Sequence, residues 1–276
     1  MLALPFGAAR ALEGELLVTA TVYPIYLAAA NIAQGTPTRV EQLAPPEGGC
    51  LHDYQLTTKD RRLLDQSDAI VINGAGLEGF LDRVLPQLPG AVIDASDGIP
   101  LLRSPVGEVN PHVWASIQGY QAQVENIIEG LSALDPANAA AYRQNGGAYL
   151  ESLRALEAEM LEQLAPVKNA RIVTVHAAFE YFAEAFGLRV VATVESEPGS
   201  APSAQELMRI LKTIEVGRVR ALFAEPGQEN PSLGILSRES GLPIYVLDPV
   251  VHGTGDLSDY ARIMRENVKT LLEALQ

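Results

Sequence analysis

Short runs of apolar and β-branched residues alternate with longer amphipathic stretches along most of this chain. In the first half, the apolar runs predict four strands, at 16–22, 39–43, 69–73 and 91–94, with helices at 25–33 and 60–66. Thr57 and Asp60 have the spacing of a capping box at the start of the second helix. Strands that alternate with helices predict a small, mainly parallel α/β unit.

The same alternation returns in the second half of the chain. Strands are predicted at 171–175, 189–194, 221–224 and 243–247, and helices at 179–186, 204–215, 232–240 and 260–275. Ser203 and Glu206 form a second capping-box pair. The two halves share this rhythm without a visible sequence repeat, so we expect two α/β lobes of similar size.

A long helical stretch separates the halves. Its apolar positions fall on one helix face, at Tyr142, Tyr149, Leu153, Leu156, Met160 and Leu164. Asp135 is predicted to cap it, with Pro136 at the first helical position and Pro166 as its end. An unbroken helix from 136 to 164 would span about 43 Å. An ordinary pair of core helices, broken at Gly146-Gly147, is the alternative.

These elements predict a domain organisation. Residues 15–134 would form an N-terminal α/β lobe, 135–165 a linking helix, and 166–276 a C-terminal α/β lobe. Residues 1–14 are apolar and rich in small residues, and are interpreted either as a leader or as the remnant of a signal peptide. Each lobe is expected to hold a mainly parallel four-stranded sheet with flanking helices.

Composition narrows the class of protein. The chain has 276 residues, of which 47% are hydrophobic, enough to bury a substantial core. Its formal net charge of −14 argues against nucleic-acid binding, which favours basic surfaces, and is compatible with attracting cations. Cys50 is the only cysteine, so no disulfide can form within the chain. No apolar run is long enough to span a membrane.

Three of the four histidines, and one aspartate, each follow a strand-like or extended stretch. His52, His112, His176 and Asp248 are separated by 60, 64 and 72 residues, so only a large pre-built fold could unite them. His176 and Asp248 come at the carboxyl ends of predicted parallel strands, where open α/β sheets bind ligands. A metal site assembled from distant segments is therefore the leading hypothesis, with isolated structural or exposed histidines as the alternative.

The chemistry of these four side chains favours binding over catalysis. Three imidazoles and one carboxylate suit Zn²⁺ in a near-tetrahedral shell, and Mn²⁺ or Fe²⁺ stay open. Four protein ligands would leave no coordination position for an activated water. Glu225 is a candidate partner of the ligands or a substitute ligand. Glu180 is expected at the surface or as a partner of a ligand, and His252 in an exposed loop, with a position near the metal as its alternative. Cys50 is expected to be a small loop residue, with a thiolate ligand as its alternative.

The main alternative to a metal site is a nucleotide-binding site. The segment Gly74-Ala75-Gly76-Leu77-Glu78-Gly79 matches G-x-G-x-x-G after a predicted strand, and Asp94 stands where a ribose-binding acid would be expected. Pro86, Pro89 and Gly90, however, leave only residues 77–85 for the helix that should follow. We therefore favour a tight turn leading into a short helix.

Taken together, these segments resemble the cluster 9 family, the solute-binding proteins of zinc and manganese ABC transporters. The similarity runs from about residue 17 to the C-terminus. Segments 52–57, 110–114 and 176–182 are similar to those that carry the first three ligands, and 247–249 to the last. The strand and turn at 69–80 are also similar, which accounts for the G-x-G-x-x-G match. Pro202-Ser203 and 223–226 match further segments of the family.

The resemblance implies two lobes joined by a long helix, with the metal between them, and delivery of the ion to an inner-membrane ABC permease by a periplasmic, monomeric protein. Zinc-specific members often carry a His-rich acidic loop before the second ligand, and 101–110 here has no histidine. Manganese members commonly have Glu at the third ligand, so His176 favours zinc. A lipid-anchoring cysteine near the start is missing.

We therefore predict a metal-binding transport protein and not an enzyme, with His52, His112, His176 and Asp248 as ligands. Metal binding should release protons and weaken as the histidines protonate near pH 6. Two alternatives stay open. An NAD-dependent oxidoreductase would use the glycine-rich turn, and a metal-dependent hydrolase would need an open coordination position with a base such as Glu225.

Overall fold

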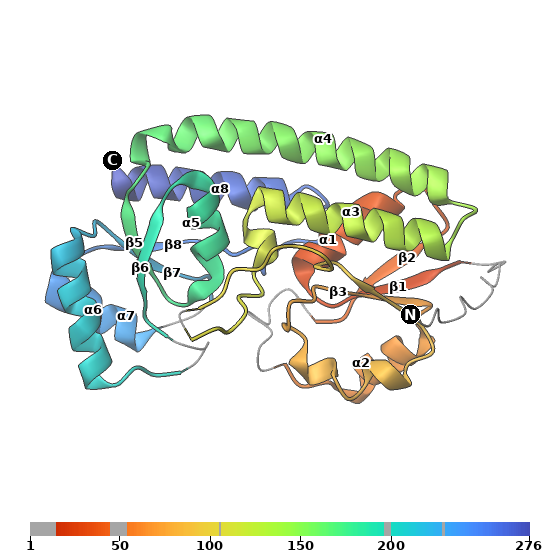
Figure 1. Cartoon of the computed structure of the whole chain (residues 1–276), viewed down its shortest axis with the longest axis horizontal. Helices are drawn as coiled ribbons and strands as arrows, with labels where there is room; N and C mark the ends of the chain where they lie inside the picture. Colours follow the sequence, from red (N-terminus) through yellow and green to blue (C-terminus); the bar gives the residue numbers. More distant parts are fainter. Residues whose placement is uncertain (1–14, 45–53, 105, 196–199, 228–229) are drawn as a thin grey trace, which may run out of the picture.

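The computed structural model describes residues 15–44, 54–104, 106–195, 200–227 and 230–276. Figure 1 shows two α/β lobes side by side, with long helices lying along both. The predicted fold class is confirmed: each lobe holds one four-stranded, fully parallel sheet. The two sheets even share one strand order, in which the first strand of each lobe lies between its second and third.

The N-terminal lobe is built on the sheet order β2-β1-β3-β4. Its strands are β1 (Leu17–Ala20), β2 (Arg39–Gln42), β3 (Ala69–Ile72) and β4 (Ala91–Asp94), and its helices are α1 (Tyr23–Ala33), α2 (Thr58–Gln66) and α3 (Ile117–Leu134). Strand β1 is buried throughout, because a central parallel strand is covered on both faces. The predicted capping box at Thr57 and Asp60 is present.

The C-terminal lobe has the order β6-β5-β7-β8. Its strands are β5 (Arg171–Thr174), β6 (Arg189–Thr193), β7 (Leu222–Ala224) and β8 (Ile244–Val246), and its helices are α5 (Glu180–Phe186), α6 (Ala204–Gly217), α7 (Pro231–Ser240) and α8 (Asp259–Leu275). The capping box predicted at Ser203 and Glu206 starts α6. Every strand boundary lies within two residues of its predicted position.

A 26-residue helix, α4 (Ala139–Leu164), runs along both lobes (Figure 1). It continues through Gly146-Gly147, so the glycines do not break it. The predicted cap is wrong, because Asp135 ends α3 and Asn138 is the N-cap of α4. The Asp135 carboxylate instead accepts hydrogen bonds from Asn138 and Tyr142, which fixes the turn between the two helices. Helix α3, for which no prediction was made, packs beside α4 and α1.

The glycine-rich segment forms a turn and not a nucleotide site. Glu78 is buried and folds back on the turn, where its carboxylate accepts hydrogen bonds from Thr21 Oγ1 at 2.6 Å, Asn73 N at 2.6 Å and Gly74 N at 3.1 Å. Those backbone N–H groups are the ones that a pyrophosphate would need. A Cβ at Gly74 would also lie 1.9 Å from Asp94 Oδ1, so the acidic side chain fills the remaining space. Only short 3₁₀ turns follow.

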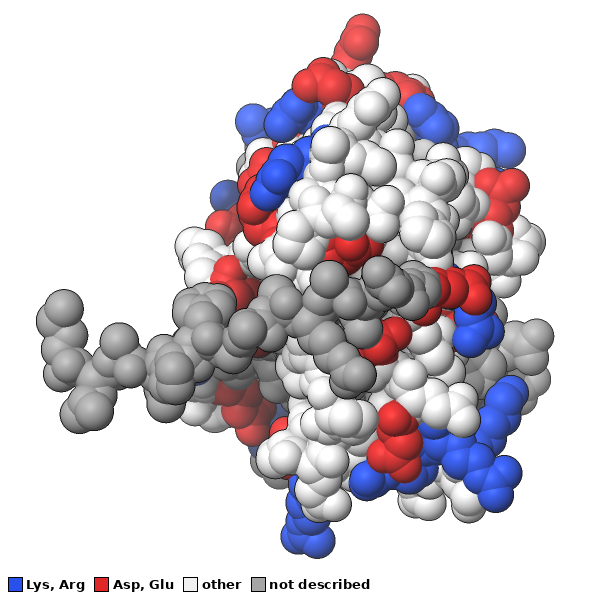
Figure 2. Space-filling view, turned by 90° about the vertical axis from the view of Figure 1, so that its right-hand side faces the viewer, with Lys and Arg blue, Asp and Glu red and all other residues white. Residues whose placement is uncertain are grey.

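No helix among the described residues combines the length and the apolar character needed to cross a bilayer. On the end of the N-terminal lobe seen in Figure 2, acidic side chains are spread over the face together with basic ones.

Candidate metal centre

The shared strand order creates a switch point in each lobe, between the first and third strands, because the second strand lies on one side of the first strand and the third and fourth lie on the other. Open α/β sheets bind ligands outside the carboxyl ends of their strands at this point. In the N-terminal lobe the position is filled by Glu78 and its hydrogen bonds to Thr21 and Asn73. In the C-terminal lobe it holds His176, which follows β5, and Glu225, which follows β7. Asp248 follows β8, the next strand along.

His112 approaches this edge from the other lobe. It precedes a 3₁₀ turn that leads into α3, and its Nε2 lies 3.3 Å from Nε2 of His176. The two rings meet edge to face, 5.0 Å apart, and both residues are buried, with exposed fractions of 2% and 3%. Two predicted ligands that are 64 residues apart in the sequence therefore converge.

Asn110 fixes the orientation of the His112 ring. Its Nδ2 donates to Ala177 O at 2.8 Å and to Glu180 Oε2 at 2.9 Å, so its Oδ1 must be the acceptor. Oδ1 then accepts from the backbone N–H of His112 at 3.0 Å and from its Nδ1 at 2.9 Å. With the proton on Nδ1, the lone pair of His112 is on Nε2, the atom that faces His176.

Glu225 has the same relation to His176. One carboxylate oxygen, Oε1, lies 2.6 Å from His176 Nδ1, and both side chains are almost fully buried. A nitrogen and a carboxylate oxygen this close need a proton between them. The proton on Nδ1 leaves the lone pair on Nε2, so each imidazole presents Nε2 to the other.

Asp248, another predicted ligand, makes no contact of this kind with His112 or His176 in the described structure. Asp248 is partly exposed, and its Oδ1 accepts from Val251 N at 3.2 Å and lies 3.9 Å from Nδ1 of His252. The nearby Asp248 carboxylate raises the pKa of His252 above its usual value. Within the described part of the chain, no three His, Cys, Asp or Glu side chains are arranged to hold one ion. His52 and Cys50 lie outside the described residues.

The backbone beside Asp248 is tied to the segment that carries His112. Trp114 donates from Nε1 to Pro249 O at 2.6 Å, and Tyr260 OH donates to Trp114 O at 2.9 Å. The indole ring also lies 5.3 Å from the His112 imidazole. The two lobes are thus connected at the candidate site itself.

Sequence reasoning did not identify Asn110. The signal was present, because an Asn side chain readily accepts from the backbone N–H two residues later, and His112 is two residues later. Glu225 was expected beside a ligand, and it contacts His176, one of the predicted ligands.

Comparison with known proteins identifies the family of this chain. The family model described as "Zinc-uptake complex component A periplasmic" (ZnuA) matches residues 18–274. The zinc-binding lipoprotein AdcA of Streptococcus pneumoniae is 28% identical over 280 residues, which cover 94% of this chain and 56% of AdcA. The chain thus spans about half the length of that relative. The iron-binding protein YfeA of Yersinia pestis is 29% identical over 255 residues, covering 88% of this chain and 81% of YfeA.

Solved structures agree. FpvC of Pseudomonas aeruginosa in complex with Mn²⁺ superposes with a TM-score of 0.85 and 33% identity, covering 95% of this chain and 98% of FpvC. A structure of FpvC with Ni²⁺ gives the same TM-score at 32% identity. The resemblance predicted from the sequence segments is confirmed, and the chain belongs to the ZnuA family of periplasmic zinc-uptake components.

Proposed function

We propose that this chain is a metal solute-binding protein that captures a divalent ion and delivers it to an ABC permease in the inner membrane. The family is one of periplasmic uptake components, which agrees with a binding protein and not an enzyme. The printed names of its relatives mention zinc and iron, and the FpvC structures contain manganese and nickel. These names and structures support a divalent metal ion as the ligand of this chain, although the ion differs from one relative to another.

The observation that carries this proposal is the 3.3 Å separation between Nε2 of His112 and Nε2 of His176. Two nitrogen lone pairs at this distance repel each other unless a proton or a cation lies between them. In a tetrahedral zinc shell with Zn–N bonds of about 2.05 Å, two ligand nitrogens are about 3.3 Å apart. The pair therefore has the separation that a tetrahedral ion requires.

We propose His52 and Asp248 as the other two ligands. Asp248 follows the strand beside β7, and its backbone is linked through Pro249 to the Trp114 segment. Four protein ligands would leave no position for a reactive water, so the site would bind its ion without hydrolysing a substrate.

We propose zinc as the physiological ion, with manganese or iron as the alternative. Three imidazoles and one carboxylate match the usual zinc donors, whereas manganese favours a larger share of oxygen ligands. His176 supplies a nitrogen at a position that is commonly Glu in manganese members of the family. We expect the protein to act as a monomer outside the inner membrane.

The test is metal analysis of protein purified without an affinity tag, followed by competition between Zn²⁺ and Mn²⁺ in calorimetry. His112→Ala and His176→Ala should each weaken zinc binding by about 100-fold or more, because each removes a direct ligand. His252→Ala is the matched control and should change affinity only a few-fold. Full zinc affinity in the His112→Ala/His176→Ala double variant would refute the proposed site.

A further inference from the structure

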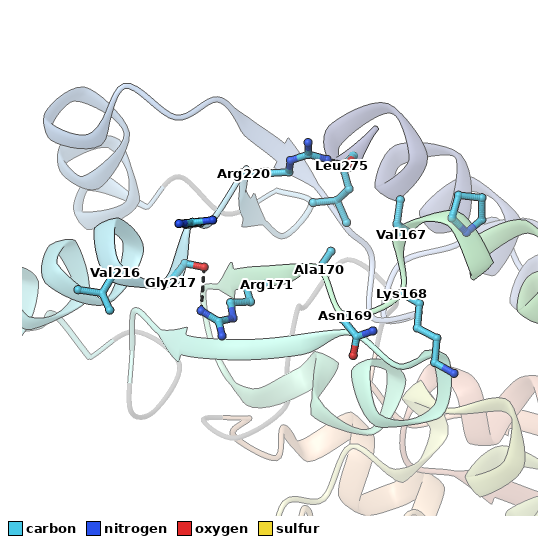
Figure 3. Close-up of a pocket in the computed structure, with 11 residues that line it drawn as sticks. Val167, Lys168, Asn169, Ala170, Arg171, Val216, Gly217, Arg220 and Leu275 are labelled. Carbon is cyan, nitrogen blue, oxygen red and sulfur yellow. Dashed lines mark hydrogen bonds between the residues drawn. The ribbon is translucent and has the colours of Figure 1, made fainter.

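A second concavity lies at the other edge of the C-terminal sheet, away from His176. It is an open cavity of about 500 Å³ at the amino ends of β5 and β7, beside the ends of α6 and α8 (Figure 3). Four of its lining residues are basic, namely Lys168, Arg171, Arg218 and Arg220, and none is Asp or Glu. The whole chain has 34 acidic residues against 20 basic ones. The lining of this cavity is therefore basic in a chain that is acidic overall.

Strand pairing brings two of the arginines together. Val173 of β5 pairs with Leu222 of β7, and the same register two residues earlier places Arg171 beside Arg220. On the other side of β5, Arg171 pairs with Arg189 of β6. Like charges on neighbouring strands repel, so this arrangement is favourable only where carbonyl oxygens or negative charge lie close by.

The Arg171 and Arg220 guanidinium groups are held in place by backbone carbonyls and not by carboxylates. Arg171 Nη1 donates to Gly217 O at 3.1 Å, at the end of α6, as Figure 3 shows, and Arg220 Nη1 donates to Leu275 O, at the end of α8. Among the described residues, neither forms an ion pair with a carboxylate. Each group can donate five hydrogen bonds, so most of its donors stay available for a ligand.

Arg218 and Lys168 complete the basic lining. Arg218 is exposed and has φ of +52° at the end of α6, a conformation that favours glycine. The exposed Lys168 side chain runs over Gly187, where a Cβ would lie 3.0 Å from its Cγ. Neither residue forms a hydrogen bond through its side chain within the described structure that would neutralise its charge.

We propose that this cavity binds a phosphate-bearing anion. Guanidinium groups bind phosphate oxygens through paired, charge-assisted hydrogen bonds. Four basic side chains line this cavity, and two of them, Arg171 and Arg220, are each held on one side by a backbone carbonyl. The volume equals that of roughly fifteen waters, which exceeds a single oxyanion and suits a diphosphate or a phosphorylated headgroup. The ligand is either a soluble diphosphate or an anionic phospholipid, and the chemistry of recognition is the same. This site is independent of the metal site.

The test uses metal-free protein at low ionic strength. Sodium pyrophosphate is titrated in calorimetry, and co-flotation is measured with phosphatidylglycerol vesicles and with phosphatidylcholine vesicles. The variant Lys168→Gln/Arg218→Gly should bind at least tenfold more weakly while keeping its melting temperature, because glycine adopts φ of +52° without strain. The control Lys59→Gln/Arg83→Gln removes the same charge from exposed positions in the N-terminal lobe.

Binding to pyrophosphate alone would identify a soluble ligand, and binding to phosphatidylglycerol vesicles alone would identify a lipid headgroup. Either supports the proposal if only the cavity variant loses it. Equal loss in the cavity variant and the control would show a general charge effect and overturn the proposal. Wild-type protein that binds neither probe, or a cavity variant with unchanged affinity, would overturn it as well.

Discussion

At the scale of single residues, the candidate site depends on two side chains that do not contact an ion themselves. Asn110 and Glu225 each engage Nδ1 of one imidazole, and both Nε2 atoms face each other as a result. Partners of this kind orient metal ligands and fix their tautomers. The metal affinity should therefore depend on Asn110 and Glu225, although neither is one of the four predicted metal ligands.

Asn110→Ala should weaken zinc binding about 10- to 100-fold, because the His112 ring loses the acceptor that fixes its proton on Nδ1. Asn110→Asp keeps an acceptor oxygen at this position and should lose less. Zinc titration by calorimetry measures both variants. An affinity in Asn110→Ala equal to that of the wild type would show that the ring is oriented by other contacts.

Glu78 gives a prediction on stability. Burial raises its pKa to about 7, while Thr21 and the Asn73 and Gly74 backbone groups oppose the rise. The folded protein therefore holds this proton more tightly than the unfolded chain. Its contribution to stability is present below about pH 4.5 and is lost as the pH rises to about 7, by on the order of 3 kcal/mol.

Glu78→Gln should remove this pH dependence. Compared with the variant, the wild type should lose unfolding free energy between about pH 4.5 and 7, with a constant difference above pH 7. Urea unfolding of metal-free protein at several pH values measures it, and Glu125→Gln, at an exposed position, is the control. A wild-type curve parallel to that of Glu78→Gln would contradict the raised pKa.

At the scale of elements, the strands and most helices could be predicted because each has a strong local signal, such as the capping boxes at Thr57 and Ser203. The cap of α4 could not, because Asp135 and Asn138 are both capping residues and tertiary contacts decide between them. The Tyr142 hydroxyl donates to Asp135 from a full two turns away. Predicting that His112 and His176 converge required the resemblance to a family, since spacing alone left isolated histidines open.

Helix α4 contains two adjacent glycines in different surroundings. A Cβ on Gly146 would lie 2.3 Å from Ile128 Cδ1 and 2.4 Å from its Cγ1, whereas a Cβ on Gly147 would meet nothing within 4 Å. Gly147→Ala should stabilise the protein by about 0.5–1 kcal/mol through helix propensity. Gly146→Ala should destabilise it by about 1–3 kcal/mol, because α3 and α4 would be pushed apart.

Thermal or urea unfolding of both glycine variants measures the difference, and each serves as the control of the other. Equal effects of the same sign would mean that α3 and α4 do not pack at Gly146 as the structure shows.

At the scale of the whole molecule, α1 of the N-terminal lobe is joined to the start of α8 in the C-terminal lobe. Tyr23 in α1 donates to Asp259 Oδ2 at 2.5 Å, at the start of α8, and accepts from Gly255 N at 3.0 Å. Tyr23→Phe should lower the unfolding free energy by about 1–3 kcal/mol, because it leaves buried polar groups with fewer partners. Tyr26→Phe, in the same helix, should have little effect. A similar loss in both variants would point to α1 packing and not to this bond.

Trp114 tests how the lobes respond to the ion. It is the only tryptophan, its ring lies 5.3 Å from His112, and its indole N–H reaches Pro249 in the other lobe. Zinc should change its fluorescence and saturate at one equivalent, and His112→Ala should abolish the change. Because α4 runs along both lobes and α8 of the C-terminal lobe also contacts α1, the radius of gyration from X-ray scattering should change by no more than about 1 Å. A change of several ångströms would mean that the long helices do not restrain the lobes, and the connection through Trp114 would then have to break on metal release.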